Sequence, residues 1–178
     1  MPPLSAAIAV ILGLQVVCTD LYARRVPNRA LLAAAVAGSV AMLMLPGFST
    51  DMPDAMAGLL LGLVLLLPFH LIGWMGAGDV KLFSVLGLLL GGDALVPLWI
   101  IASLLAGVHA AAGMAAKSGV TLGFISRSPP ALRAYIFVNG IDLFNRMKAS
   151  REGRKGIPYA AYLGIATLLI VFTGVSHG

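Results

Sequence analysis

The sequence predicts an all-α, polytopic membrane protein with six transmembrane helices and both termini on the non-cytoplasmic side. Of its 178 residues, 60% are hydrophobic and only 11% are charged, a balance that would hardly keep a water-soluble domain of this size in solution. The apolar residues also form six runs, and five of these are long enough to approach the roughly 20 residues of a spanning helix. The runs cover residues 3–19, 30–45, 55–75, 82–90, 94–116 and 157–175.

The fourth run is the exception, because it is too short to span a membrane alone. Its helix must therefore begin near Gly78 and carry Asp79 and Lys81 into the interfacial layer. Charge placement supports this span: with six helices, all 12 Lys and Arg residues lie on the side of the first, third and fifth connections, as cytoplasmic loops require. Without the fourth span, the basic connection 117–156 would lie on the other side of the membrane from Arg24 and Arg25, in conflict with the same rule.

Local signals place the remaining elements. Pro27-Asn28 can open the second helix, with Asn28 as its cap, and Asp51-Met52-Pro53 can open the third. Small residues at Gly58-x-x-x-Gly62 and Gly87-x-x-x-Gly91 allow close helix packing in lipid. Two interpretations of the cytoplasmic connection 117–156 stay open, a basic amphipathic surface helix and a solvated loop. We expect a single transmembrane domain over residues 1–178.

Two acidic residues at the ends of these runs are functional candidates, because a charge in lipid costs several kcal/mol. Asp20 ends the first run, and Asp79 begins the fourth within Gly76-Ala77-Gly78-Asp79-Val80-Lys81. On the predicted topology both carboxyls lie at the same depth near the cytoplasmic face. Like charges resist double ionisation, so the pair would share one proton. A carboxylate that deprotonates water beside an acid that protonates a carbonyl can hydrolyse a peptide bond without a metal.

Each of these residues also has a structural interpretation. Asp20 taken alone fits an interfacial acid neutralised by Arg24 or Arg25, and the two glycines fit a simple turn. Lys81 either pairs with Asp79 or extends toward lipid phosphates, and we favour the second. Two other functional classes also use such acids or tolerate them: a proton-coupled transporter with the two Asp as a relay, and a non-catalytic subunit of a secretion machine.

Several site types have no candidates in the sequence. The basic residues lie between apolar runs, which indicates topology signals and argues against nucleic acid as a partner. A single cysteine, Cys18, rules out a thiolate zinc site, and His70 and His109 lack the spacing of a histidine metal motif. We therefore expect neither a metal nor a cofactor.

At Gly76-Ala77-Gly78-Asp79-Val80-Lys81-Leu82 and at Asp20…Arg25-Val26-Pro27-Asn28, the chain resembles the type IV prepilin peptidases, the Gly-x-Gly-Asp class of membrane aspartyl proteases. Gly156-Ile157-Pro158-Tyr159-Ala160 is similar to the Pro-Tyr segment that opens the last helix of that family. A second proline often follows there, where this chain has Ala161-Tyr162. The short first connection and the single cysteine are most similar to the compact peptidases of Flp/Tad pilus systems.

The resemblance implies roles for individual residues. Asp20 and Asp79 would be the catalytic pair, and Gly76, Gly78 and Lys81 would form the active-site loop. A further set would contact substrate or support the site, namely Arg25, Pro27, Asn28, Pro158 and Tyr159.

The resemblance also implies a function. The protein would be a bacterial inner-membrane endopeptidase that removes the short basic leader of prepilins or pseudopilins at the cytoplasmic interface, after a glycine. Its partners would be those substrates, membrane lipids, and pilus or secretion machinery.

Overall fold

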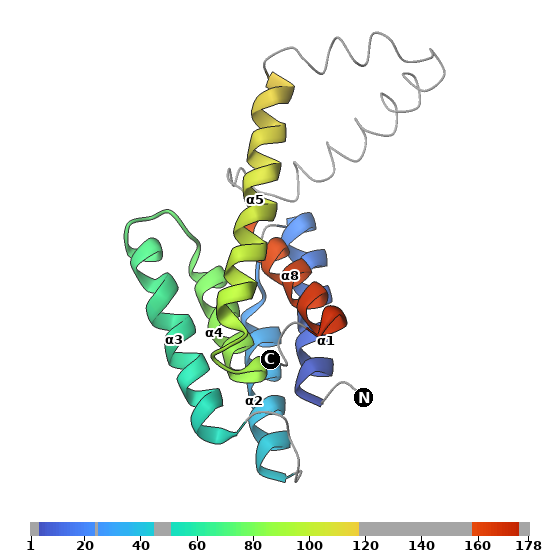
Figure 1. Cartoon of the computed structure of the whole chain (residues 1–178), viewed down its shortest axis with the longest axis vertical. Coiled ribbons are helices and arrows are strands. Elements are labelled where there is room, and N and C mark those ends of the chain that lie inside the picture. Colours follow the sequence, from blue (N-terminus) through green and yellow to red (C-terminus); the bar gives the residue numbers. More distant parts are fainter. Residues whose placement is uncertain (1–3, 24, 45–50, 118–157, 175–178) are drawn as a thin grey trace, which may run out of the picture.

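The computed structural model describes residues 4–23, 25–44, 51–117 and 158–174, and the regular structure in these ranges is entirely helical (Figure 1). This confirms the all-α prediction. The described helices are α1 (Leu4–Ala23), α2 (Asn28–Met44), α3 (Met52–Leu71), α4 (Ala77–Leu90), α5 (Leu95–Lys117) and α8 (Tyr159–Thr173). Each falls on one of the six predicted apolar runs. The connection predicted at 117–156 lies outside the described residues, apart from Lys117 at the end of α5.

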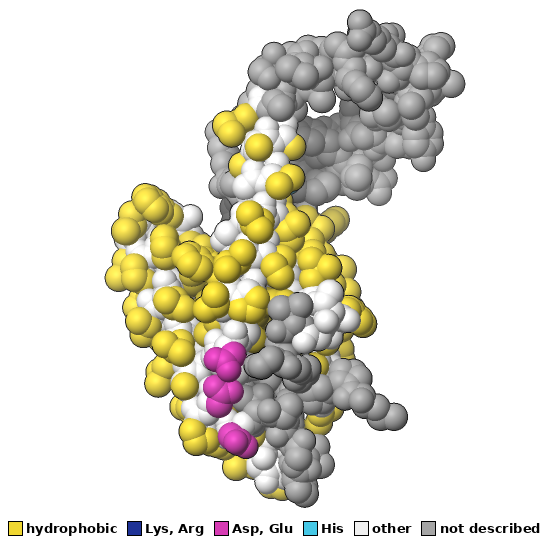
Figure 2. Space-filling model, in the orientation of Figure 1, with side chains coloured by type: hydrophobic (Ala, Val, Ile, Leu, Met, Phe, Trp, Pro, Cys, Tyr) yellow, Lys and Arg dark blue, Asp and Glu magenta, His cyan; other side chains and the backbone are white. Residues whose placement is uncertain are grey.

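Three helices are long and apolar enough to cross a membrane: α1, α3 and the part of α5 from Leu95 to Met114. The helices α2 and α8 are apolar but shorter. The outer surface is correspondingly apolar, as Figure 2 shows over α3 and α5, and side chains such as Leu60, Val64 and Leu104 are more than half exposed. Such a surface is typical of helices in contact with lipid. The number of six spans and the side on which the termini lie stay predictions.

The short helix α4 lies at the centre of the bundle. It packs against each of the other five described helices, and all of residues 82–89 are buried. A helix that is apolar around its whole circumference is expected in such a position. Its first residue, Ala77, agrees with the prediction that the fourth helix begins near Gly78. The central position of α4 places Asp79, in its first turn, within reach of several neighbouring helices.

The third apolar run forms less helix than its hydrophobicity suggests. Although the run extends to residue 75, α3 ends at Leu71. Gly73 has a φ of 84°, a left-handed conformation that glycine adopts without strain and that ends a helix. The apolar residues after α3 therefore form the turn into α4, and Trp74 in this turn is largely exposed.

Glycines allow the closest helix contacts. A Cβ atom on Gly58 of α3 would collide with the backbone of Gly87 in α4, and a Cβ on Gly62 would lie 2.9 Å from the α4 backbone. These contacts confirm the packing role predicted for the glycines of α3. A second contact joins α1 to α8, where a Cβ on Gly164 would lie 2.7 Å from the carbonyl oxygen of Gly13.

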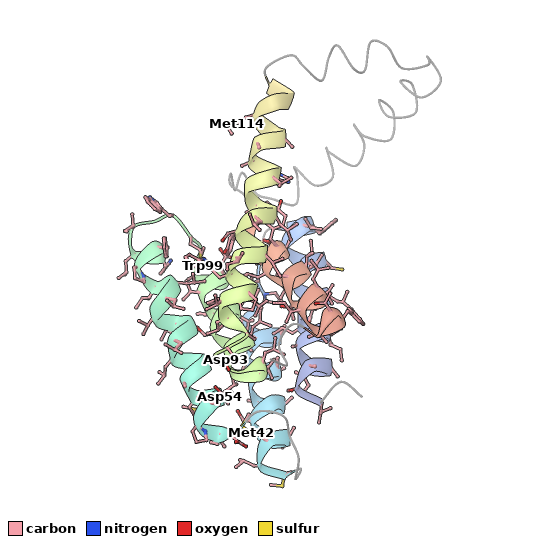
Figure 3. All side chains as sticks on the ribbon, viewed as in Figure 1. Met42, Asp54, Asp93, Trp99 and Met114 are labelled. Atoms are coloured by element: carbon pink, nitrogen blue, oxygen red, sulfur yellow. The ribbon has the colours of Figure 1, made fainter. Side chains whose placement is uncertain are left out.

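The bundle has two different ends. At one end lie the last turn of α1 and the first turns of α4 and α8 (Figure 1). The opposite end holds Asp54 and Asp93, which Figure 3 labels near the start of α3 and between α4 and α5. Asp54 accepts a hydrogen bond from the N–H of Gly92 at 3.3 Å, just beyond the end of α4. The candidate site lies at the end remote from these two acids.

Candidate active site

The first turn of α8 brings the two predicted acids together. Asp20, in the last turn of α1, is only 6% exposed, and one of its carboxyl oxygens accepts a hydrogen bond of 2.9 Å from the backbone N–H of Ala161. Asp79 accepts a hydrogen bond from the backbone N–H of Ala160 and lies close enough to Asp20 for the two carboxyls to interact electrostatically. Two consecutive amides of one helix thus contact one carboxyl each.

The position of these amides in α8 explains why they are available. The first N–H groups of a helix have no partner within the helix, and the helix dipole adds partial positive charge there. Since α8 begins at Tyr159, after the buried Pro158, its second and third residues are Ala160 and Ala161. Proline at either of these positions could not donate such a bond. Alanine at position 161, which departs from the family pattern noted above, therefore keeps a donor for Asp20.

Asp79 also accepts a hydrogen bond at the start of its own helix, α4. Its Oδ2 atom accepts a hydrogen bond of 3.1 Å from the backbone N–H of Gly76, which stands immediately before α4 in an extended conformation. A carboxylate in this position satisfies an N–H that would otherwise lack a partner. The side chain of Asp79 thus connects the start of α4 to the start of α8, and its orientation is fixed from two directions.

The two predicted motifs lie side by side. Val26, in the connection between α1 and α2, packs on Gly78, where an added Cβ would lie 3.1 Å from the Cβ of Val26. Lys81 is exposed, and its Nζ lies 3.5 Å from the side-chain oxygen of Asn28 in a long hydrogen bond. The cap predicted for α2 is wrong. The carbonyl of Pro27 accepts the first hydrogen bonds of that helix, so Asn28 is its first helical residue and its amide is available to Lys81.

Two predicted residues remain, Tyr159 and Arg25. Tyr159 is half-buried and close enough to Asp79 to interact with it electrostatically, and its hydroxyl lies 3.2 Å from that of Ser103 in α5. Arg25 is exposed in the connection after α1. Sequence reasoning missed Ser103 and the amides of Ala160 and Ala161. A single serine in an apolar helix carries no sign of the helix it faces. The Pro-Tyr segment, which indicates a helix start, is the signal that could have indicated free amides there.

The arrangement suits acid–base chemistry. Two carboxyls that interact and each accept a backbone hydrogen bond can hold one proton between them, so that one acts as a base and the other as an acid. In the described part of the chain, no three His, Cys, Asp or Glu side chains form a group that could hold a metal ion.

Comparison with protein families places these motifs in a known context. The model of the type IV leader peptidase family matches residues 7–111, more than half of the chain. This range contains both aspartates, the glycine loop and Ser103, and it ends before α8. Neither the curated proteins nor the solved structures gave a match.

Proposed function

The chain belongs to the type IV leader peptidase family, and we propose that it is a membrane aspartyl endopeptidase in which Asp20 and Asp79 are the catalytic pair. Its substrates are prepilins or pseudopilins, from which it removes the short basic leader at the cytoplasmic face of the bacterial inner membrane. The observation that supports the pair most directly is that carboxyls from α1 and α4 interact with each other and bond to consecutive amides of α8.

The proposed reaction uses one proton held by the pair. The ionised carboxylate removes a proton from a water molecule, whose oxygen attacks the scissile carbonyl carbon, while the protonated carboxyl donates its proton to the carbonyl oxygen. The tetrahedral intermediate then collapses: its C–N bond breaks, and the nitrogen takes up a proton from the carboxyl that received it from water. One hydroxyl of the intermediate returns its proton to the other carboxylate, so the products are a carboxylic acid and an amine and the pair again holds one proton. No metal ion enters any of these steps. The amides of Ala160 and Ala161 keep both carboxyls oriented throughout.

The place of the pair in the bundle suits the proposed substrate. A prepilin has a short basic leader on the cytoplasmic side and an apolar helix in the bilayer, so the bond to be cut lies at the interface. Asp20 and Asp79 both lie near helix ends, where such a junction could reach them. Exposed Arg25 and Lys81 lie nearby; they would repel a basic leader, and we assign them to anionic lipid headgroups.

The same geometry disfavours a proton-coupled transporter. A relay across the membrane needs acids or interrupted helices near the middle of the spans. Asp20 and Asp79 instead lie in the last turn of one helix and the first turn of another. Pilus or secretion machinery remains the expected assembly partner, and a purely non-catalytic role in it is tested by the experiment below.

Co-expression with a Flp-type prepilin in cells that lack a prepilin peptidase tests the proposal. Asp20→Asn and Asp79→Asn each keep an oxygen that can accept the amide bond but remove the carboxyl, so cleavage should fall by about 100-fold or more. Asp93→Asn is the matched control, because Asp93 is exposed at the opposite end of the bundle. Normal leader removal by both Asp20→Asn and Asp79→Asn at wild-type protein levels would refute the proposal.

A further inference from the structure

A pair of hydroxyl groups links α5 to the start of α8. The hydroxyl oxygens of Ser103 and Tyr159 are 3.2 Å apart, and either group can be the donor. Tyr159 is the first residue of α8 and directly precedes the two amides that bond Asp79 and Asp20. The contact therefore joins α5 to Tyr159, the residue immediately before the two amide donors.

The hydroxyl of Tyr159 has a partner within the protein. A half-buried phenol that packs against apolar helices usually finds a hydrogen-bond partner for its hydroxyl, and Ser103 provides one. With the hydroxyl held at one end and the backbone fixed in the first turn of α8 at the other, the ring has one orientation beside Asp79. Without Ser103, rotation of the ring would change both the space beside Asp79 and the packing at the start of α8.

Comparison with Ser84 shows that the contact made by Ser103 is unusual for a serine in a helix. Helical serines commonly bond the carbonyl of the preceding turn of their own helix. Ser84 in α4 does so, with its hydroxyl 2.9 Å from the carbonyl oxygen of Val80. Ser103 instead reaches across to another helix and to a residue beside a candidate catalytic carboxyl.

We propose that Ser103 is a positioning residue of the peptidase: through its hydrogen bond it holds the ring of Tyr159 beside Asp79 and fixes the first turn of α8 against the two carboxyls. This inference rests on the proposed function. It assigns no contact between Ser103 and the substrate. Its action passes through Tyr159, so its effect should appear in the rate of the chemical step and not in substrate binding.

Cleavage kinetics of the purified full-length enzyme with a detergent-solubilised prepilin test this assignment. Ser103→Ala should lower kcat roughly two- to tenfold, the range expected for one hydrogen bond, with KM unchanged. Tyr159→Phe should have an effect of the same size, and the double variant should be no slower than the slower single variant. Ser103→Thr, which keeps the hydroxyl, should restore kcat. Ser84→Ala, the matched control, should keep the wild-type kcat.

Several outcomes would overturn the proposal. These are a wild-type kcat in Ser103→Ala, a change in KM alone, independent effects of the two substitutions in the double variant, no recovery with Ser103→Thr, or an equal loss in Ser84→Ala. Because alanine favours helix and Ser103 is exposed on α5, the variant should fold, and thermal unfolding in detergent checks this. If Ser103→Ala is unaffected while Asp79→Asn is inactive, only this inference fails. Cleavage by Asp79→Asn would instead refute the proposed function.

Discussion

Replacing Gly164 by alanine should disturb the site without touching any of its side chains. Gly164 lies on α8 one turn after Ala161, and it faces Gly13 and Val17 of α1, the helix that carries Asp20. An added Cβ would lie 2.7 Å from the carbonyl oxygen of Gly13 and 2.7 Å from a methyl carbon of Val17. One of these atoms belongs to the backbone, so α1 and α8 must move apart.

The distance by which α1 and α8 separate determines whether the hydrogen bond to Asp20 survives. Ordinary contact for a Cβ begins at 3.4 Å, so the helices must separate by about 0.7 Å at this point. The bond from the Ala161 N–H to Asp20, now 2.9 Å, would lengthen to about 3.6 Å and be lost. Crowding of this kind costs about 1–3 kcal/mol of folding free energy. A displaced carboxyl should slow cleavage by roughly 10- to 100-fold.

Gly13→Ala provides a matched control at the same helix contact. Its Cβ would lie 3.2 Å from the carbonyl oxygen of Gly164, so a shift of about 0.2 Å would suffice and the bond to Asp20 would survive. Initial rates of prepilin cleavage and thermal unfolding in detergent should be measured for both variants. If folded Gly164→Ala cleaves as fast as Gly13→Ala, the contact between α1 and α8 does not control the position of Asp20.

Two further substitutions test the contacts around the glycine loop. Gly78→Ala should slow prepilin cleavage roughly three- to tenfold, because its Cβ would lie 3.1 Å from that of Val26. Adding Val26→Ala keeps the Cβ but removes a methyl carbon that would lie 3.2 Å from the added atom, so it should recover part of the rate, and a double variant no faster than Gly78→Ala would contradict this explanation. Lys81→Met should change the free energy of unfolding by less than about 0.5 kcal/mol, because Lys81 is exposed and its bond to Asn28 is long. A loss above about 2 kcal/mol in detergent unfolding would show that this bond is important.

The sequence was sufficient to predict the helices and the shared end of the bundle at which Asp20 and Asp79 lie, for physical reasons. Apolar runs of spanning length can hardly form anything but helices in lipid, because every backbone group must be paired. Asp20 and Asp79 were visible because a carboxyl at the edge of such a run is costly and therefore rare. The topology then placed both at one end, and their electrostatic interaction agrees with that expectation.

What the sequence could not provide are the partners of these residues. The donors to both carboxyls are backbone amides of two alanines, and an alanine side chain carries no sign of such a role. The facing pair Gly13 and Gly164 was equally hidden, since a single glycine in an apolar run does not indicate which helix it faces. The cap predicted at Asn28 was wrong because the carbonyl of Pro27 accepts the first hydrogen bonds of α2, which leaves Asn28 inside the helix.

The origin of the amide donors in α8 has a consequence for biosynthesis. Asp20 and Asp79 are made early, but the N–H groups that orient them belong to residues 160 and 161. A nascent chain still on the ribosome therefore holds both acids in the membrane without the turn that aligns them. Proteolytic activity should begin only after the C-terminal helix has been inserted, so neighbouring polypeptides at the insertion site are not exposed to a partly built enzyme.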